Sequence, residues 1–472
     1  MPNTKIVATL GPASDSPEIV RSLLLAGVDV FRLNASHGTR EDLEQRIRIV
    51  RGVSHELGIH AGILLDLQGP KIRLGTFVEG RCTLKSGDYF TITTEPVPGT
   101  REIASTTYSE FASDVSVGDR ILLNDGAVEL CVVSKDGPAV KCEVIHGGEI
   151  GDRKGINLPG VKISAPSLTK KDLADLHFGI EMRVDFVALS FVRTANDVLR
   201  LKFILEEKEA PISIVAKIEK PEAVQNLDAI LKESDGVMVA RGDLGIELAL
   251  EKVPFIQKSI IRKARMLGKF VITATQMLES MIHHANPTRA EVSDVANAIY
   301  DGTDAVMLSG ETAAGRYPVE AARMMDRIAA EAEASLRQRG QRELPQLEDP
   351  STAEIIADAA VRATKIANAR AIVVFTARGN SARNVARYRP LVPVYAFTPT
   401  PEGARQMSLI YGAHPLVAEN AGSTDEMIAT MESRLKEAGL VKRGDRVIFT
   451  SGQPIGRPGT TNMMMLHTIG ES

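Results

Sequence analysis

Short apolar runs that end abruptly in polar residues recur along the first two thirds of the chain. Such runs are typical of buried parallel strands. Helical segments lie between them, and Thr39 with Asp42 and Thr169 with Asp172 resemble capping boxes at helix starts. Strands that alternate with helices predict a (β/α)8 barrel. The expected strands are Lys5–Leu10, Val28–Asn34, Gly62–Asp66, Phe186–Phe191, Ile212–Ile218, Gly236–Ala240, Phe270–Ala274 and Ala305–Leu308.

Each predicted strand ends in, or is followed by, polar residues that could bind a ligand. In a (β/α)8 barrel the catalytic groups come from the C-terminal ends of the strands, which meet on one face. A single polar strand end is weak evidence because βα loops are generally polar, but the pattern across the whole set predicts a site. The residues are Thr9, Arg32, Asn34, Ser36, Asp66, Arg73, Ser190, Lys217, Glu219, Arg241, Asp243, Thr275, Gln276, Ser309 and Glu311.

Two adjacent predicted strands are followed by the largest number of charged candidate site residues. Because side chains alternate along a strand, Lys217 and Glu219 share one side while Ile218 packs on the other. Asp243 follows the next strand and adds a carboxylate, and Gly242 lets the backbone approach a ligand closely. This set suits a divalent metal that clamps an anionic substrate. Ordinary surface ion pairs at strand ends are the alternative reading of either segment alone.

The βα rhythm stops between residues 71 and 164, where strand-like pieces are separated by turn pairs and no helical period appears. We expect a small all-β domain, a β-barrel, inserted at 71–164 into a catalytic barrel formed by 1–70 and 165–340. A linker rich in charge and proline follows at 341–351. Residues 352–472 predict a C-terminal α/β domain, with strands at Ala371–Phe375, Val392–Phe397 and Arg446–Thr450 and a β-like end at Met463–Ile469.

Composition excludes several partners. The net charge of the 472-residue chain is −4 with both signs interspersed, and only 4% of residues are aromatic. Neither a nucleic-acid platform nor a membrane surface is therefore expected. No apolar run approaches the ~20 residues of a spanning helix, so we expect a cytoplasmic protein. Its cysteines, Cys82, Cys131 and Cys142, lack metal-ligand spacing and are interpreted as reduced thiols.

Several common catalytic and nucleotide-binding motifs are absent from the sequence. The chain has neither the G-x-x-x-x-G-K-[ST] phosphate loop nor the G-x-G-x-x-G dinucleotide fingerprint, and no Cys–His pair or G-x-S-x-G elbow. What remains is a metal and cations around a small anion. Such a site can run phosphoryl transfer by positioning and charge neutralisation alone.

Several segments resemble pyruvate kinase, and the likeness covers nearly the whole chain. It is most specific in the barrel and weaker in the insert and the C-terminal domain. The segments are Thr4–Ser14, Arg32–Gly38, Ala216–Glu219, Arg241–Gly245, Ala274–Met281, Asn286–Glu291 and Met307–Thr312.

The resemblance implies transfer of phosphate from phosphoenolpyruvate to ADP, through an enolate that is protonated to pyruvate. Glu219 and Asp243 match the carboxylates that bind Mg²⁺ or Mn²⁺. Lys217 matches the lysine that offsets the charge of the phosphoryl group in flight, and Arg32 matches a phosphate-binding arginine. Thr275 is linked to enolate protonation through water. The implied substrate-binding residues are Arg32, Lys217, Gly242, Asp243 and Thr275.

The implied nucleotide contacts lie partly in the insert. Asn34, His37, Arg73 and Lys154 match residues on the nucleotide side of the family's site. That placement makes the insert a lid that closes and excludes water.

One motif departs from many family members. They read Asp-Thr-Lys-Gly-Pro-Glu where this chain has Asp66-Leu67-Gln68-Gly69-Pro70-Lys71, and they bind K⁺ at positions matching Asn34, Ser36, Asp66 and Leu67. The Lys71 ammonium brings that positive charge covalently, so we expect activity without K⁺. A solvated Lys71 beside an intact K⁺ site is the alternative.

Regulation and assembly are also implied by the resemblance. Thr376, Arg378, Asn380 and Ser381 follow a C-terminal strand and, with Arg457, match a sugar-phosphate effector loop. The expected activator is a sugar phosphate or AMP, although an ordinary capped turn explains the first four residues equally well. A homotetramer is the family expectation.

Two rival functions remain open. One is an aldolase or lyase of the phosphoenolpyruvate and pyruvate barrels, which would need no nucleotide lid. The other is a catalytically silent sugar-phosphate-binding regulator.

Overall fold

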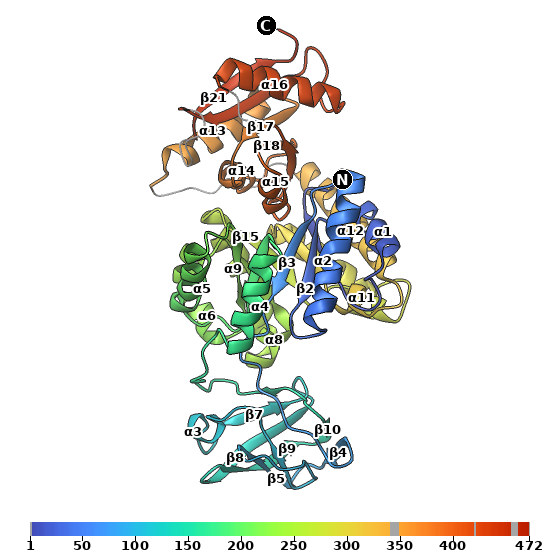
Figure 1. Ribbon diagram of the computed structural model, residues 1–472, viewed down its shortest axis with the longest axis vertical. Coiled ribbons are helices and arrows are strands. Elements are labelled where there is room, and N and C mark those ends of the chain that lie inside the picture. The colour runs from blue at the N-terminus through green and yellow to red at the C-terminus, as the bar shows by residue number, and fades with distance from the viewer. Residues whose placement is uncertain (1, 340–348, 420–421, 455–460, 472) are drawn as a thin grey trace.

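The computed structural model describes residues 2–339, 349–419, 422–454 and 461–471. The molecule is elongated, with three parts arranged along its long axis (Figure 1). The barrel lies in the middle, the insert at one end and the C-terminal part at the other.

The central part is a closed barrel of parallel strands, which confirms the predicted (β/α)8 fold. Among the described residues eight strands close the ring in the order β1-β16-β15-β14-β13-β12-β3-β2. The strand predicted at Phe186–Phe191 ends earlier, at Leu189, because Ser190 and Phe191 form a turn in which Phe191 adopts a φ of 55°. The strands are β1 (Lys5–Thr9), β2 (Val30–Asn34), β3 (Gly62–Asp66), β12 (Phe186–Leu189), β13 (Ser213–Ile218), β14 (Gly236–Ala240), β15 (Phe270–Ala274) and β16 (Ala305–Leu308).

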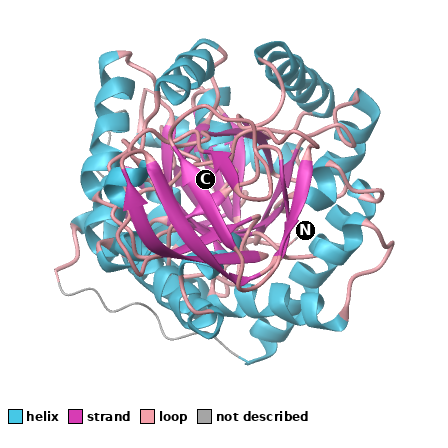
Figure 2. Ribbon diagram, turned by 90° about the horizontal axis from the view of Figure 1, so that it is seen from below, coloured by secondary structure: helices cyan, strands magenta, loops and turns pink. Residues whose placement is uncertain are grey.

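Helices surround the strands, as the view from below shows (Figure 2). The capping boxes predicted at Thr39 and Thr169 are both present, so local polar sequence sets where these helices begin. The helices are α1 (Pro17–Leu25), α2 (Arg40–Leu57), α4 (Lys170–Glu181), α5 (Ala195–Glu207), α6 (Pro221–Gln225), α7 (Leu227–Glu233), α8 (Arg241–Glu247), α9 (Val253–Met266), α10 (Arg289–Asp301), α11 (Gly310–Ala313) and α12 (Pro318–Arg339), with short 3-10 turns at Leu250–Lys252 and Glu279–Ile282.

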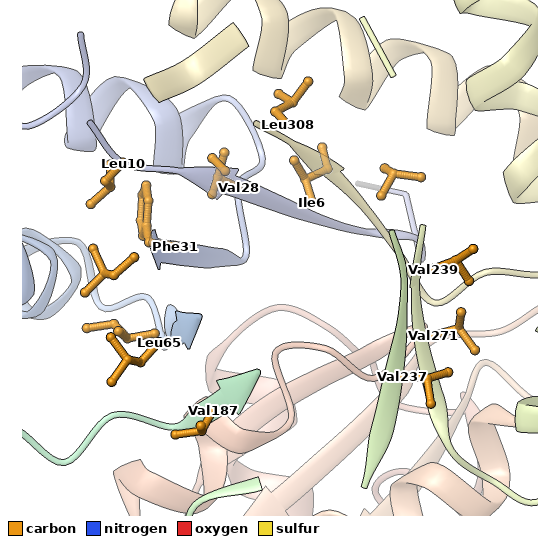
Figure 3. Packing of buried hydrophobic residues seen from close by; sticks show 14 of the residues in the cluster. Ile6, Leu10, Val28, Phe31, Leu65, Val187, Val237, Val239, Val271 and Leu308 are labelled. Carbon is orange, nitrogen blue, oxygen red and sulfur yellow. The ribbon is translucent and has the colours of Figure 1, made fainter. Parts of the chain in front are cut away.

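Strand alternation divides the core into two layers. Ile6 and Ala8 of β1 pack in the large cluster between strands and helices, part of which Figure 3 shows, while Val7 points into the barrel. The inner layer also contains Leu409 of the C-terminal part, which is fully buried. The C-terminal part therefore helps to fill the barrel at its N-terminal end.

The insert follows β3 and has a hydrophobic core of its own. Within the described residues it contains a six-stranded sheet, β11-β7-β8-β9-β5-β6, and a two-stranded pair, β10-β4. A four-residue helix, α3 (Phe111–Asp114), was not predicted. The strands are β4 (Arg81–Leu84), β5 (Tyr89–Thr93), β6 (Ile103–Ser105), β7 (Arg120–Leu123), β8 (Val128–Asp136), β9 (Ala139–His146), β10 (Gly148–Gly151) and β11 (Ile156–Asn157).

The C-terminal part has an α/β fold. Its described strands form one sheet in the order β19-β18-β17-β20-β21. Strand β19 was not predicted, because His414 and Pro415 interrupt its apolar pattern. The elements are α13 (Thr352–Ile366), β17 (Ala371–Phe375), α14 (Asn380–Ala386), β18 (Val394–Thr398), α15 (Pro401–Gln406), β19 (Ala413–Val417), α16 (Thr424–Glu437), β20 (Arg446–Gly452) and β21 (Thr461–Thr468).

Across the described ranges, none of the helices combines the length and the apolar character that a membrane crossing requires.

Candidate active site

Lys217, at the end of β13, lies at the centre of a buried polar cluster. Its Nζ is 2.8 Å from Glu219 Oε1 and 3.4 Å from Asp66 Oδ1, and it donates to Ser190 Oγ at 2.8 Å. Only 12% of the Lys217 side chain is exposed. Burial alone would lower the pKa of Lys217, but the Asp66 and Glu219 carboxylates outweigh it and raise the pKa. The ammonium therefore stays charged at neutral pH.

Asp66 joins two cations at the end of β3. Its Oδ2 accepts from Arg32 Nε at 2.7 Å, and Arg32 Nη1 donates to Thr9 Oγ1 at 3.1 Å. Burial would raise the pKa of Asp66, but Lys217 and then Arg32 outweigh that effect and lower it. The predicted strand-end residues Thr9, Arg32, Asp66 and Lys217 thus come together.

Glu219 and Asp243 lie on the same side of the barrel. Burial raises the pKa of the Glu219 carboxyl, and the charge of Asp243 adds to this increase while Lys217 opposes it. The backbone N–H of Phe191, in its left-handed conformation, donates to Glu219 Oε2 at 2.7 Å. A buried carboxylate that a second carboxylate repels is a fitting place for a divalent cation.

The rest of a metal shell would have to come from other groups. In the described ranges no set of three or more His, Cys, Asp or Glu side chains forms a ready metal cage. Two carboxylates with the remaining positions left for water and substrate oxygens match the way Mg²⁺ is bound beside phosphate substrates.

Thr275, directly after β15, is held in a conformation that β-branched residues rarely adopt. Its φ is 69°. The N–H of Gly242 donates to Thr275 Oγ1 at 2.8 Å, and Arg241 Nη2 donates to the Thr275 carbonyl at 2.7 Å. Arg241 also pairs with Asp294 of α10 at 2.7 Å. These contacts position Thr275 beside the Gly242 backbone, as strained residues at functional sites often are.

The insert brings further cations toward this face. Lys71, Asp125 and Asp243 line one cavity between the insert and the barrel. Burial lowers the pKa of His37, and the charges of Arg73, Lys71 and Arg32 lower it further. Lys71 and Arg73 therefore lie within electrostatic range of the β2 end.

Other predicted site residues lie away from the cluster around Lys217. Lys154 is exposed on the insert, where its carbonyl accepts from the Leu74 N–H at 2.8 Å. Asn34 Oδ1 accepts from the Ser36 N–H at 3.1 Å, and the Leu67 carbonyl accepts from Ser190 Oγ at 2.7 Å.

The residues of the predicted effector loop, which follows β17, face two different directions. Thr376 Oγ1 accepts from the Gly379 N–H at 3.0 Å, and Ser381 Oγ lies 2.6 Å from Thr461 Oγ1 of β21. Arg378 and Asn380 instead line a cavity that faces the barrel. Arg457 lies outside the described residues.

Sequence reasoning gave Ser190 no role and missed Lys220 and Glu247. The Lys220 ammonium and Glu247 form a buried ion pair that links the end of β13 to α8. Lys220 directly follows Glu219, and Glu247 lies one helical turn after Asp243. Because both residues lie so close in the sequence to the two predicted metal carboxylates, their spacing alone could have marked them as candidate site residues.

Comparisons with known proteins agree with this geometry. A family model described as pyruvate kinase, barrel domain, matches residues 1–322, and one described as pyruvate kinase, alpha/beta domain, matches residues 354–467. A pyruvate kinase of Staphylococcus epidermidis is 46% identical over 474 residues, covering 100% of this chain and 81% of the relative. A pyruvate kinase of Staphylococcus aureus has the same identity and coverage.

A solved structure extends the agreement to the whole fold. The crystal structure of a pyruvate kinase from Cryptosporidium parvum superposes with a TM-score of 0.92 at 36% sequence identity, covering 99% of this chain and 96% of that chain. With both family models matched and full-length relatives at this identity, the chain belongs to the pyruvate kinase family.

Proposed function

We propose that this chain transfers phosphate from phosphoenolpyruvate to ADP, giving pyruvate and ATP. The observation that carries the proposal is the buried Lys217 ammonium, held by Asp66, Glu219 and Ser190 beside Arg32. A fixed cation in a site of low dielectric stabilises charge that develops on a phosphoryl group in transfer. Membership in the pyruvate kinase family supports the same reaction.

The other residues have complementary roles in the proposed reaction. Arg32 binds the phosphate, since its guanidinium is oriented by Asp66 and Thr9. Glu219 and Asp243 would hold Mg²⁺ or Mn²⁺, which when bound neutralises oxygen charge on the substrate. The Gly242 backbone and Thr275 Oγ1, joined by a hydrogen bond, hold the substrate carboxylate, and Thr275 orients the water that protonates the enolate.

The insert contributes residues that would contact ADP. Arg73 and Lys154 are carried by the insert and Asn34 and His37 by the barrel rim, so movement of the insert toward the barrel would bring them around ADP. Closure would also exclude water, which competes with ADP for the phosphoryl group.

Replacing Lys217 by methionine tests the proposal. We expect the Lys217→Met variant to lose about a hundredfold to a thousandfold in kcat, with little change in the apparent KM for phosphoenolpyruvate, because the charge acts mainly in the transition state. Coupled assays of pyruvate formation, with and without ADP, measure this loss and separate a kinase from a lyase.

Lys263→Met is the matched control, because Lys263 forms an exposed ion pair with Asp228. It should retain wild-type kinetics. Pyruvate formation without ADP, or an unchanged kcat in Lys217→Met, would contradict the proposed reaction.

We also propose that catalysis needs no K⁺. Lys71 lines the cavity that Asp243 also lines, so its ammonium can supply the monovalent charge there. Two of the family's K⁺ positions already have partners, because the Asp66 carboxylate pairs with Arg32 and Lys217 and the Leu67 carbonyl accepts from Ser190.

Activity in tetramethylammonium alone tests this point. We expect the wild type to keep most of its kcat there, whereas Lys71→Glu should require K⁺ for comparable activity because it removes the built-in cation. Lys71→Arg is the control that keeps the charge. A collapse of wild-type activity without K⁺ would reject the proposal.

The proposed regulation is activation by a sugar phosphate or AMP at the loop after β17. The support is local: the Thr376 and Ser381 hydroxyls flank a turn that β21 approaches. Titrations at subsaturating phosphoenolpyruvate decide it, and a flat response to both ligand types would mean no effector.

The proposed assembly is a homotetramer. Leu250, just before α9, and Phe255 of α9 are 73% and 74% exposed, and Ile366 of α13 is 87% exposed, which favours subunit contacts on both the barrel and the C-terminal part. Light scattering on the purified chain measures the mass, and a monomer would contradict this expectation.

A further inference from the structure

A buried ion pair outside the cluster around Lys217 joins Lys220, after β13, to Glu247 of α8. The Lys220 side chain is 7% exposed and the Glu247 side chain 1%. The second oxygen of the Glu247 carboxylate has no hydrogen-bond partner among the described residues, so the Lys220 ammonium is the group that balances its charge. A buried pair contributes little net stability, because desolvation costs about as much as the attraction returns. What this pair determines is the relative position of the two segments that carry it.

Each partner lies close along the chain to one of the two proposed metal carboxylates. Lys220 directly follows Glu219. Asp243 and Glu247 are four residues apart in α8, so they lie on the same face of the helix, about one turn from each other. The contact that brings Glu247 to Lys220 therefore also turns the face that carries Asp243 toward the end of β13.

The Lys220 end of this contact is held by the backbone. Its carbonyl accepts from the Ala223 N–H at 3.0 Å and from the Val224 N–H at 3.3 Å, where α6 begins. The Lys220 ammonium also lies 5.9 Å from the centre of the Phe191 ring. The N–H of the same Phe191 donates to Glu219 Oε2 at 2.7 Å. Lys220 thus extends from a fixed helix start, past the residue that orients Glu219.

Helix α8, at the other end of the contact, has few other anchors. It is seven residues long, no side chain caps its N-terminus, and of its residues only Leu244 and Glu247 are buried. Its open side faces a cleft of about 690 Å³ between the barrel and the insert. A helix this short is not stable by itself, so tertiary contacts set its orientation.

Two polar contacts hold α8 from opposite sides. Near its N-terminal end, the Gly242 N–H donates to Thr275 Oγ1 at 2.8 Å, after β15. Arg241 pairs there with Asp294 of α10 at 2.7 Å. At its C-terminal end, Glu247 connects the helix to the β13 side. Strand β14, which leads into α8, lies between β13 and β15 in the barrel. Without the second contact, α8 would lose what sets its rotation about its own axis.

We propose that Lys220 and Glu247 form a positioning pair for the divalent metal, which fixes the separation and direction of the Glu219 and Asp243 carboxylates. Those carboxylates are the metal ligands of the proposed function, on which this inference rests. Neither Lys220 nor Glu247 needs to touch the metal or the substrate. Ligands that are held in place bind a cation more tightly, because less free energy is lost in bringing them together, and Mg²⁺ tolerates little departure from octahedral geometry.

Removal of the Lys220 charge separates position from electrostatics. Lys220→Met deletes a cation near the metal carboxylates and leaves the Glu247 charge unbalanced, so electrostatics alone would tighten the binding of a divalent cation. A positioning role has the opposite consequence. We expect Lys220→Met to raise the dissociation constant for Mn²⁺ about tenfold or more, as for other residues that orient metal ligands. Electron paramagnetic resonance of free Mn²⁺, in titrations of the intact protein without substrates, measures this constant.

A charge-balanced double variant keeps the test independent of the unpaired carboxylate. Lys220→Met with Glu247→Leu leaves the net charge unchanged and replaces the pair by apolar side chains, which proteins commonly tolerate without loss of stability. It should also bind Mn²⁺ about tenfold more weakly, because the directional contact is gone. If Lys220→Met does not fold, the double variant decides.

Two further variants calibrate the titrations. Arg389→Leu is the matched control, because it breaks an ion pair of similar burial with Asp304 at the N-terminal end of the barrel strands. It should leave the affinity for Mn²⁺ unchanged. Asp243→Asn removes a proposed ligand itself and should bind Mn²⁺ at least as weakly as Lys220→Met.

The outcomes separate this inference from the proposed function. Unchanged or tighter Mn²⁺ binding by either folded Lys220 variant would overturn the positioning role. An equal loss in Arg389→Leu would also overturn it, by tracing the effect to general destabilisation. If the wild type binds no Mn²⁺, or Asp243→Asn binds it as the wild type does, the metal assignment itself is wrong and this inference falls with it. A loss in Asp243→Asn alone would leave the proposed metal site standing without the pair.

Discussion

Ser190 shows how a single hydroxyl can order a charged site. Lys217 donates to Ser190 Oγ at 2.8 Å, and Ser190 Oγ donates to the Leu67 carbonyl at 2.7 Å. The hydroxyl therefore connects the ends of β13 and β3 through β12. A lysine side chain carries many rotamers, and this connection restricts Lys217 to one direction.

We expect Ser190→Ala to reduce kcat about tenfold to a hundredfold, because it removes a hydrogen bond to a charged group. Steady-state assays at saturating phosphoenolpyruvate measure the loss. Ser54→Ala is the matched control, since the buried Ser54 hydroxyl of α2 has no hydrogen-bond partner among the residues that the structure describes. Equal kcat values for the two variants would show that Ser190 does not position Lys217.

At the scale of elements, aspartates join the barrel strands to one another and to the C-terminal part. Each stands directly before a strand and accepts an N–H at or near the start of a neighbouring strand, which would otherwise have a free donor there. The bonds run from Ile6 to Asp29, Ile63 to Asp185, Ile214 to Asp235 and Val271 to Asp304, at 2.8–3.0 Å.

The C-terminal part supplies cations to three of these carboxylates. Arg405 pairs with Asp185 at 2.9 Å, Arg383 with Asp235 at 3.2 Å and Arg389 with Asp304 at 2.9 Å. The barrel and the C-terminal part are therefore held together by charge as well as by the packing of Leu409.

Breaking the Arg389–Asp304 pair should be costly. Both side chains are under 10% exposed, so Arg389→Leu leaves a buried carboxylate without its cation, at a cost of about 3–5 kcal/mol. Urea unfolding followed by circular dichroism measures the change.

Arg362→Leu provides the comparison, because its ion pair with Asp358 is exposed and worth at most about 1 kcal/mol. A double variant, Arg389→Leu with Asp304→Asn, should be less destabilised than the sum of the single changes. Equal midpoints for Arg389→Leu and Arg362→Leu would contradict this account.

At the scale of the whole molecule, His414 makes the joint between the parts sensitive to pH. His414 belongs to β19, where burial and then the charge of Lys5 lower its pKa to about 4. Lys5 itself reaches across to the Ala413 carbonyl at 2.9 Å. Between pH 4 and 6.5 the unfolded chain therefore binds a proton at this residue that the folded chain does not.

Stability contributed by neutral His414 should be complete above about pH 6.5 and lost as the pH falls toward about 4, by at most about 3 kcal/mol. The difference between wild type and His414→Gln in unfolding free energy, measured from pH 7.5 to 4, isolates this contribution from other titrating groups. A difference that is independent of pH would exclude the role of His414.

Local sequence determined the order of strands and helices, several helix starts and the pairing of Lys217 with Glu219. Strand period, apolar runs and capping boxes act between residues close in the chain, so they can be read without a structure. The resemblance to pyruvate kinase added the roles expected for Arg32 and Thr275, which spacing alone does not reveal.

Tertiary structure decided what depends on residues far apart in the chain. The Ser190 hydroxyl, the ion pairs between the parts and strand β19 all depend on such contacts. Their energies come from burial and from charges brought within a few ångströms, quantities that local pattern does not contain. The chain alone therefore specifies which groups reach the barrel face, and only the packed fold decides how each is charged and held.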